Sequence, residues 1–236
     1  RDLFIAEGIT VVTRLLASSI PVQSVLVLDS RVERVRPLVP EHVPLLVTDR
    51  DTMNSTVGFD LHRGVLACAT RPPWTPLERI ATQHHLVAMV EGLNDHENLG
   101  AIARSARALG VDSLVLDPTT ADPWYRRCVR VSMGEILHLP IARAADWPEP
   151  IHVLQQSGFV VAALTPSHDA ITLDELAVRQ PQRVALLLGA EGPGLSPTSL
   201  ASADVRVRIP IRREVDSLNV GHAAAIAFAA LGHPNR

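Results

Sequence analysis

Residues 184–195 read Val-Ala-Leu-Leu-Leu-Gly-Ala-Glu-Gly-Pro-Gly-Leu. The first five residues form a continuous apolar run, which is typical of a strand buried on both faces of a sheet. The run leads into a loop with three glycines, Gly189, Gly192 and Gly194, so its backbone can approach a ligand closely. A tight structural turn needs the same glycines, and they do not decide between a turn and a binding loop. Glu191, in the middle of the loop, is the residue that a simple turn does not require.

Apolar runs of the same kind occur upstream of this loop. They predict strands over 86–90, 114–116 and 159–164, and helical spacing of apolar side chains predicts a helix over 99–109. Strands that alternate with helices in this way predict an α/β domain, residues 84–236, with a parallel sheet between helices. Such sheets bind ligands at the carboxyl ends of their strands, which is where the glycine-rich loop lies.

The beginning of the chain predicts a smaller α/β domain over residues 1–71. The stretch 71–76 contains three prolines, which neither a helix nor a central strand accommodates. We therefore predict a linker over 72–83. The elements predicted before the linker are a helix over 2–18 and strands over 25–28, 45–47 and 64–69.

The composition is that of a folded protein: 47% of the 236 residues are hydrophobic and 20% are charged. No apolar run approaches the ~20 residues that a membrane-spanning helix needs, so we expect no membrane association. With only Cys68 and Cys128 there is no disulfide framework, which predicts a reducing, cytoplasmic location. The chain begins at Arg1 rather than Met, so we expect a few residues to precede it.

The charge pattern is local rather than global. The net charge of −3 argues weakly against nucleic acid as a partner, and all 22 basic residues are arginines. A GC-rich genome explains this arginine bias as well as phosphate recognition does, so the placement of the arginines must decide. Residues 1–83 are neutral, whereas seven arginines fall in two short stretches of the second half, at 126, 127, 130, 206, 208, 212 and 213.

Common catalytic signatures are missing from the sequence. A chain without lysine has no Walker phosphate loop, and neither a dinucleotide fingerprint nor a Gly-x-Ser-x-Gly elbow occurs. Neither cysteine has partners at metal-binding spacing, so we predict no metal site. His84 and His85 are adjacent on a predicted strand and would point to opposite faces, which favours structural roles over a ligand pair.

Two further segments place polar residues where a strand ends. In the first, Asp95 or His96 lies near the N-terminus of a helix, Asn98 falls in its first turn and Arg104 follows on an Ala-rich face. An exposed ion pair explains Arg104 as well as a functional role does. In the second segment, residues 207–223, Asp216 or Ser217 is the predicted cap of a helix that reaches Leu231.

That last helix is apolar almost all round, so we expect it to be buried, with another subunit as one candidate for its cover. Ser217 and Asn219 would then lie at the buried N-terminal end of this helix, where polar side chains need hydrogen-bond partners.

Together the three segments resemble the SpoU/TrmH family of RNA ribose 2′-O-methyltransferases, which belong to the knotted SPOUT class. The family patterns are met by residues 98–104 (Asn-x-Gly-x-x-x-Arg), 189–194 (Gly-x-Glu-Gly-x-Gly) and 217–220 (Ser-Leu-Asn-Val). Each motif alone is weak, but all three occur in the family's order and spacing over 84–236. His96 departs from the family, which usually has Pro at that position.

The first domain resembles the small ribosomal-protein-like RNA-binding domain that many members carry. The match is looser and rests on Phe4-x-x-Glu7-Gly8 and His62-Arg63-Gly64.

The resemblance implies a deep trefoil knot that forms a pocket for S-adenosyl-L-methionine. Gly189, Ile209 and Leu218 would offer backbone groups to this cofactor, and Thr165 would end a neighbouring strand beside it. The resemblance also implies a homodimer with the site at the subunit boundary, and no metal.

For catalysis the resemblance points to Arg104. A guanidinium stays charged in proteins, so we favour stabilisation of the developing alkoxide over a role as base. Asn98, Ser217 and Asn219 would orient the ribose and Arg104, and Glu191 would hold that network or accept the proton.

For RNA contact we predict Arg126, Arg130 and Arg212, with Arg127 and Arg213 as further candidates. Ribosomal RNA fits the extra N-terminal domain better than transfer RNA, because the smallest tRNA-type members lack it. The alternatives are an RNA-binding protein with this fold but no catalysis, and a knotted methyltransferase that acts on a base.

Overall fold

The computed structural model describes residues 2–58, 61 and 63–232, so the family match at His62 lies outside the described residues. The chain forms two compact units. The first comprises the residues up to Pro73 together with Asp122–His138, and the second comprises Trp74–Ala121 and the residues from Leu139 onward. Segment 122–138 therefore belongs to the first unit, although the predicted division placed it in the domain over 84–236.

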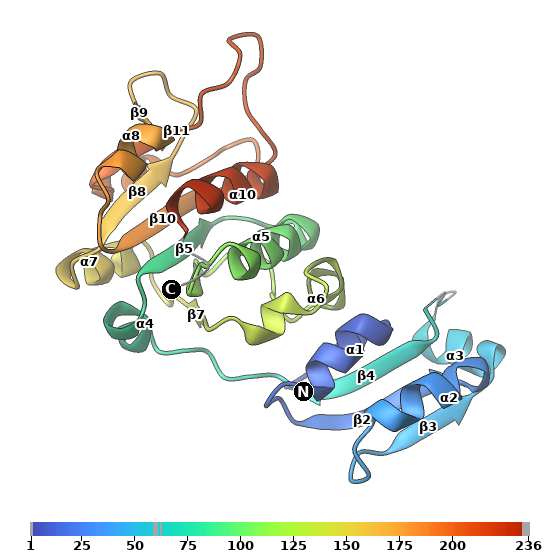
Figure 1. Ribbon diagram of the computed structural model, residues 1–236. Coiled ribbons are helices and arrows are strands. Elements are labelled where there is room, and N and C mark those ends of the chain that lie inside the picture. The colour runs from blue at the N-terminus through green and yellow to red at the C-terminus, as the bar shows by residue number, and fades with distance from the viewer. Residues whose placement is uncertain (1, 59–60, 62, 233–236) are drawn as a thin grey trace. The chain divides into compact units, whose positions relative to one another are not determined.

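The first unit is built on a sheet with the strand order β1-β4-β2-β3, in which β2 and β3 are parallel and β4 is antiparallel to both β1 and β2 (Figure 1). Its strands are β1 (Leu3–Glu7), β2 (Val22–Leu28), β3 (Leu45–Thr48) and β4 (Val65–Thr70). Its helices and 3-10 turns are α1 (Ile9–Leu16), η1 (Asp29–Arg31), α2 (Val32–Val35), η2 (Arg36–Leu38), α3 (Arg50–Val57), α6 (Arg126–Val131) and η3 (Glu135–His138).

The predicted helix over residues 2–18 is wrong in its first part. Phe4 and Ala6 are buried whereas Leu3 and Ile5 are exposed, which is the two-residue period of a strand. Gly8 then adopts a φ of 91°, a conformation that side-chain-bearing residues rarely adopt, and α1 begins directly after it. The apolar spacing read as one helix therefore combines a strand with a shorter helix.

The second unit is an α/β sheet with the strand order β7-β6-β5-β10-β8-β11-β9, and every neighbouring pair is parallel, as predicted. Its strands are β5 (Leu86–Glu91), β6 (Ser113–Leu116), β7 (Ile141–Arg143), β8 (Val160–Leu164), β9 (Ile171–Thr172), β10 (Val184–Gly189) and β11 (Val205–Arg208). Its helices are α4 (Leu77–Gln83), α5 (His96–Ala108), α7 (Glu149–Gln156), α8 (Leu173–Val178), α9 (Pro197–Ser202) and α10 (Val220–Leu231).

Helix layers cover this sheet on both sides. On one side, Ile80 of α4 and Leu154 of α7 pack in a buried cluster with alternate residues of β5, β10 and β8. On the other side, α5 and α10 pack against each other (Figure 1). The structure also corrects the predicted linker over 72–83, because residues 77–83 form α4 and contribute Ile80 and Ala81 to this core.

Charged side chains hold segment 122–138 against the first unit's own strands. The buried Glu7 carboxylate accepts a hydrogen bond of 2.8 Å from Arg126 Nη1, and Arg130 Nη1 lies 3.7 Å from the same oxygen. Arg14 Nη2 lies 3.0 Å from Glu135 Oε1. Arg126 and Arg130, which we predicted to bind RNA, thus have an acidic partner inside the protein.

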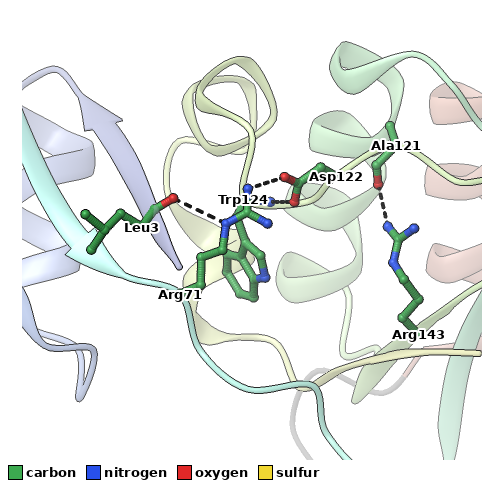
Figure 2. Close-up of polar contacts among 6 residues, drawn as sticks. All are labelled: Leu3, Arg71, Ala121, Asp122, Trp124 and Arg143. Carbon is green, nitrogen blue, oxygen red and sulfur yellow. Dashed lines mark hydrogen bonds and ion pairs between the residues drawn. The ribbon is translucent and has the colours of Figure 1, made fainter. Parts of the chain in front are cut away.

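A further contact anchors the start of this segment. Figure 2 shows Arg71 in an ion pair with Asp122 and donating through Nε to the Leu3 carbonyl oxygen at 3.3 Å. The other Asp122 oxygen accepts from the Trp124 backbone N–H at 2.9 Å, and Trp124 packs beside Phe4. The residues after Asp122 are therefore fixed by both polar and aromatic contacts.

Removal of both arginines is expected to destabilise the protein by about 3 kcal/mol, because a buried carboxylate without its cations is costly. The measurement is the free energy of unfolding of the Arg126→Ala/Arg130→Ala variant in urea. Arg127→Ala is the control: Arg127 is exposed, and its loss should cost less than about 1 kcal/mol. Equal stability of the two variants would show that the Glu7 pairs contribute little.

No helix in the described part of the chain is both long and apolar enough to cross a membrane.

Candidate active site

The candidate site lies at the carboxyl ends of β5, β8, β10 and β11 in the second unit. Strands β5 and β10 are neighbours in the sheet, but the chain continues from β5 to β6 on one side and from β10 to β11 on the other (Figure 1). A crevice forms outside a parallel sheet where the chain direction switches in this way. The fold itself therefore places a ligand site where the glycine-rich loop follows β10.

A cavity of about 450 Å³ opens at this point. The four predicted cofactor residues, Thr165, Gly189, Ile209 and Leu218, all line it, as do Glu191, Ser217 and Asn219. Sequence reasoning missed the apolar wall that completes it, formed by Leu164, Pro166, Leu188, Ile211, Val220 and Ala223. The cavity thus combines backbone polar groups at strand ends with a hydrophobic surface, which is the usual make-up of a small-molecule site.

The glycine-rich loop closes on itself tightly. A Cβ atom on Gly189 would lie 2.4 Å from both Gly194 C and Leu195 N, so no other residue fits there without moving the backbone. Ala190 and Gly194 pair in an antiparallel bridge, and Gly192 and Gly194 have φ values of 86° and 70°. The glycines are therefore required by the geometry of the loop.

Asn219 is the centre of a hydrogen-bond network at the mouth of the cavity. Its Nδ2 donates to Glu191 Oε1 at 2.6 Å and to Asn98 Oδ1 at 2.9 Å. Its Oδ1 accepts from the backbone N–H groups of Gly221 and His222 at 3.0 and 3.2 Å, so Asn219 is the N-cap of α10. The predicted cap at Asp216 or Ser217 is wrong by a few residues, because Asn219 holds that position.

This network assigns different tasks to the predicted residues. An amide has two donor hydrogens, and Asn219 uses both within the protein. Asn219 therefore positions Glu191 and Asn98. Glu191 Oε1 also lies 3.4 Å from the Val220 backbone N–H, so the first of its two predicted roles, holding the network, matches its contacts.

Asn98 links the network to α5. Asn98 is buried, and its Nδ2 lies 3.4 Å from Asp95 Oδ2. Asp95 is the N-cap of α5 and accepts from the Glu97 backbone N–H at 2.7 Å. The helices α5 and α10 approach closely beside it, since a Cβ on Gly221 would lie 3.2 Å from Ala101 Cβ.

Ser217 and Arg104 lie outside the hydrogen-bond network. Ser217 lines the cavity, is exposed, and its hydroxyl has no hydrogen-bond partner among the described residues. Arg104 is exposed on α5 and, within the same part of the chain, has neither an ion pair nor a hydrogen bond through its side chain. It does not line the cavity. Both side chains are free to contact a substrate.

The predicted RNA-binding arginines divide between the two units. Arg212 is exposed in the loop between β11 and α10, close in sequence to cavity residues Ile211 and Ser217. Arg126 and Arg130 belong to the first unit and pair with Glu7. Of the three, only Arg212 therefore belongs to the unit that holds the cavity.

Glu91 is a polar residue that the sequence analysis did not single out. It ends β5, is buried, and its Oε2 lies 3.4 Å from the Ser196 backbone N–H at the end of the glycine-rich loop. A carboxylate that ends a strand of apolar residues was the available signal, because such a group needs a nearby donor.

Comparison with known proteins adds to this geometry. The model of the SpoU rRNA methylase family matches residues 85–229, which include the β5–α5 junction, the glycine-rich loop and most of α10. The chain belongs to this family. The family segment begins one residue before β5 and includes every strand of the sheet that forms the cavity.

Relatives of this SpoU family member cover both units. An uncharacterised tRNA/rRNA methyltransferase of Mycobacterium tuberculosis is 47% identical over 97% of this chain and 80% of its own length. The 23S rRNA (guanosine(2553)-2′-O)-methyltransferase RlmP of Bacillus subtilis is 27% identical over 95% of this chain and 86% of its own. Among solved structures, the AdoMet-bound rRNA methyltransferase from Sinorhizobium meliloti has a TM-score of 0.82 and 27% identity, covering 98% of this chain and 87% of that one.

Proposed function

We propose that this SpoU family member transfers a methyl group from S-adenosylmethionine to a ribose 2′-hydroxyl of ribosomal RNA. Membership of the family makes the chain an RNA methyltransferase, and S-adenosylmethionine is its cofactor. The observation that supports the ribose as the acceptor is the Asn98–Asn219–Glu191 network beside the cavity. Support for ribosomal RNA comes from RlmP and the Sinorhizobium enzyme, which are similar to this chain over both units.

The cavity fits this cofactor. Gly189, Ile209 and Leu218 line it and would offer backbone groups to the cofactor, and the loop leaves no space at Gly189 for a side chain. Leu188 and Ile211 add apolar surface of the kind that an adenine ring packs against. When bound, S-adenosylmethionine supplies an electrophilic methyl group.

The protein's own residues must activate and orient the acceptor. A ribose hydroxyl is a poor nucleophile at neutral pH, so its developing negative charge has to be stabilised. Arg104 has a permanent charge and no partner in the described chain, which suits it to the alkoxide or an adjacent phosphate. Ser217 would orient the ribose from the cavity wall, whereas Asn98, Asn219 and Glu191 position the loop and the helix start.

The assembly is part of the proposal. The solvent-exposed Arg104 does not line the cavity of its own chain, so a homodimer with the site at the subunit boundary would bring Arg104 to a site. We also propose that the segment from β10 to α10 is knotted around the cofactor, as the family resemblance implies, and that the enzyme acts in the cytoplasm.

The decisive experiment maps ribose 2′-O-methylation in ribosomal and transfer RNA from cells with and without the gene. We expect one ribosomal ribose to lose its methyl group, and to regain it with the wild-type gene but not with Arg104→Ala. Unchanged methylation in every RNA would favour a non-catalytic RNA-binding protein. Loss of a methyl group from a base would favour the other class of knotted enzyme.

A further inference from the structure

A second cavity, of about 290 Å³, lies entirely within the first unit. Its charged lining residues are three arginines, Arg31, Arg34 and Arg63. The other described residues that line it are Gly8, Ile9, Thr10 and Val65, so no acidic side chain lines it within the described part of the chain. The candidate active site lies in the second unit and does not include this cavity.

The three arginines come from two separated parts of the chain. Arg31 ends η1 and Arg34 belongs to α2, whereas Arg63 follows α3 and precedes β4. All three are exposed, and none has a hydrogen bond or an ion pair through its guanidinium group within the described residues. By contrast, Arg126, Arg130, Arg14 and Arg71 of the same unit pair with carboxylates. The fold therefore brings three guanidinium groups, none of them paired within the described residues, to one cavity despite their mutual repulsion.

The backbone adds donors to the same place. Helix α1 begins in the cavity wall at Ile9, and its N-cap is Gly8, which offers no side chain to the first N–H groups. The N–H groups of a first helical turn have no partners within the helix. Because Gly8 lacks a Cβ, Arg63 packs directly against the helix start: a Cβ there would lie 2.9 Å from Arg63 Cδ and 3.2 Å from Nη1.

We infer that this cavity binds a phosphate group of the RNA backbone. Guanidinium groups match phosphate oxygens through paired N–H donors, and a helix N-terminus favours an anion. The inference rests on the proposed function, since RNA is the phosphate-bearing partner of that function. It gives the first unit a local, arginine-made RNA contact formed by residues other than Arg126 and Arg130, which pair with Glu7.

The experiment titrates full-length protein with ribosomal RNA from cells that lack the gene, at several potassium chloride concentrations. For the Arg31→Ala/Arg34→Ala/Arg63→Ala variant we expect an affinity for RNA at least about tenfold lower than that of the wild-type protein. The slope of log affinity against log salt concentration should decrease in magnitude by about 0.7–0.9, which corresponds to the loss of one phosphate contact. The same three positions changed to lysine keep the charge and should retain most of the slope.

The matched control is Arg36→Ala, which removes an exposed arginine of the same unit that does not line the cavity. Binding of S-adenosylmethionine, measured by calorimetry, should be unchanged in every variant and reports that the second unit is folded. An RNA affinity and slope equal to those of Arg36→Ala would overturn the inference. The inference would also be overturned if the wild-type cavity bound free inorganic phosphate while the triple alanine variant bound RNA as tightly as the wild-type protein does. If the wild-type protein itself does not bind ribosomal RNA, the proposed function fails instead.

Discussion

Substitution of Arg104 by alanine is expected to lower the rate of methyl transfer by about 100- to 1000-fold, which is the usual cost of removing one donor that stabilises a developing oxyanion. The reason is chemical: the ribose hydroxyl gains negative charge as it attacks, and Arg104 is a cation on α5 without a partner in the described part of the chain. Because Arg104 does not line the cofactor cavity, binding of S-adenosylmethionine should persist. Single-turnover methylation of ribosomal RNA and calorimetry with the cofactor measure the two effects separately.

Arg107→Ala is the matched control for this prediction. Arg107 lies one turn further along α5 and is also exposed, so its loss removes the same charge from the same helix. We expect nearly wild-type methyl transfer from it. A wild-type rate for Arg104→Ala would rule out the proposed mechanism, and loss of cofactor binding would place Arg104 in the cofactor pocket instead.

Substitution of Gly189 by alanine is expected to impair the cofactor pocket itself. The new methyl group would lie 2.4 Å from two backbone atoms of residues 194 and 195, so the glycine-rich loop must open. Overpacking of this kind costs about 1–3 kcal/mol. If the bound state bears that cost, the affinity for S-adenosylmethionine falls by about 10- to 100-fold. Calorimetry of cofactor binding and unfolding in urea together measure how much of the cost appears as lost cofactor affinity and how much as lost stability.

Gly158→Ala is the control for backbone strain alone. Gly158 has a φ of 86° and nothing within 4 Å of the position of its Cβ, so alanine there meets strain without a clash. We expect about 1–2 kcal/mol of lost stability and unchanged cofactor affinity. Wild-type affinity in Gly189→Ala would mean that the loop accommodates the methyl group and does not define the pocket.

The sequence predicted four of the seven strands of the second sheet, because those four are continuous apolar runs, and it missed the shorter or polar strands β7, β9 and β11. The run 184–188 and its companions are buried on both faces, and their short length and bounding turn residues favour strands over buried helices. The start of the chain was harder, since the apolar residues between 4 and 16 fit a helical spacing even though a strand and a helix share them. Only the pairing of β1 with β4 and the φ of Gly8 separate the two.

The candidate site was predictable where a motif carries the local geometry. The cavity is lined by four short segments, residues 164–166, 188–194, 209–211 and 217–223, and the second and fourth of them hold motifs that were visible in the sequence. The cap of α10 was not predictable, because Asp216, Ser217 and Asn219 are all good capping residues and the tertiary contacts of Asn219 with Asn98 and Glu191 select one of them.

The sequence alone determined four strands of the second sheet, the glycine-rich loop and the three motifs, because each depends on neighbours within a few residues. The tertiary structure decided what depends on distant partners. Arg126 and Arg130 lie in a basic stretch, yet Glu7, more than a hundred residues away, pairs with them. No sequence pattern links Arg31, Arg34 and Arg63, yet the fold brings them to one cavity. The sequence shows where each arginine is, but the tertiary fold decides whether a carboxylate distant in the sequence already pairs with it.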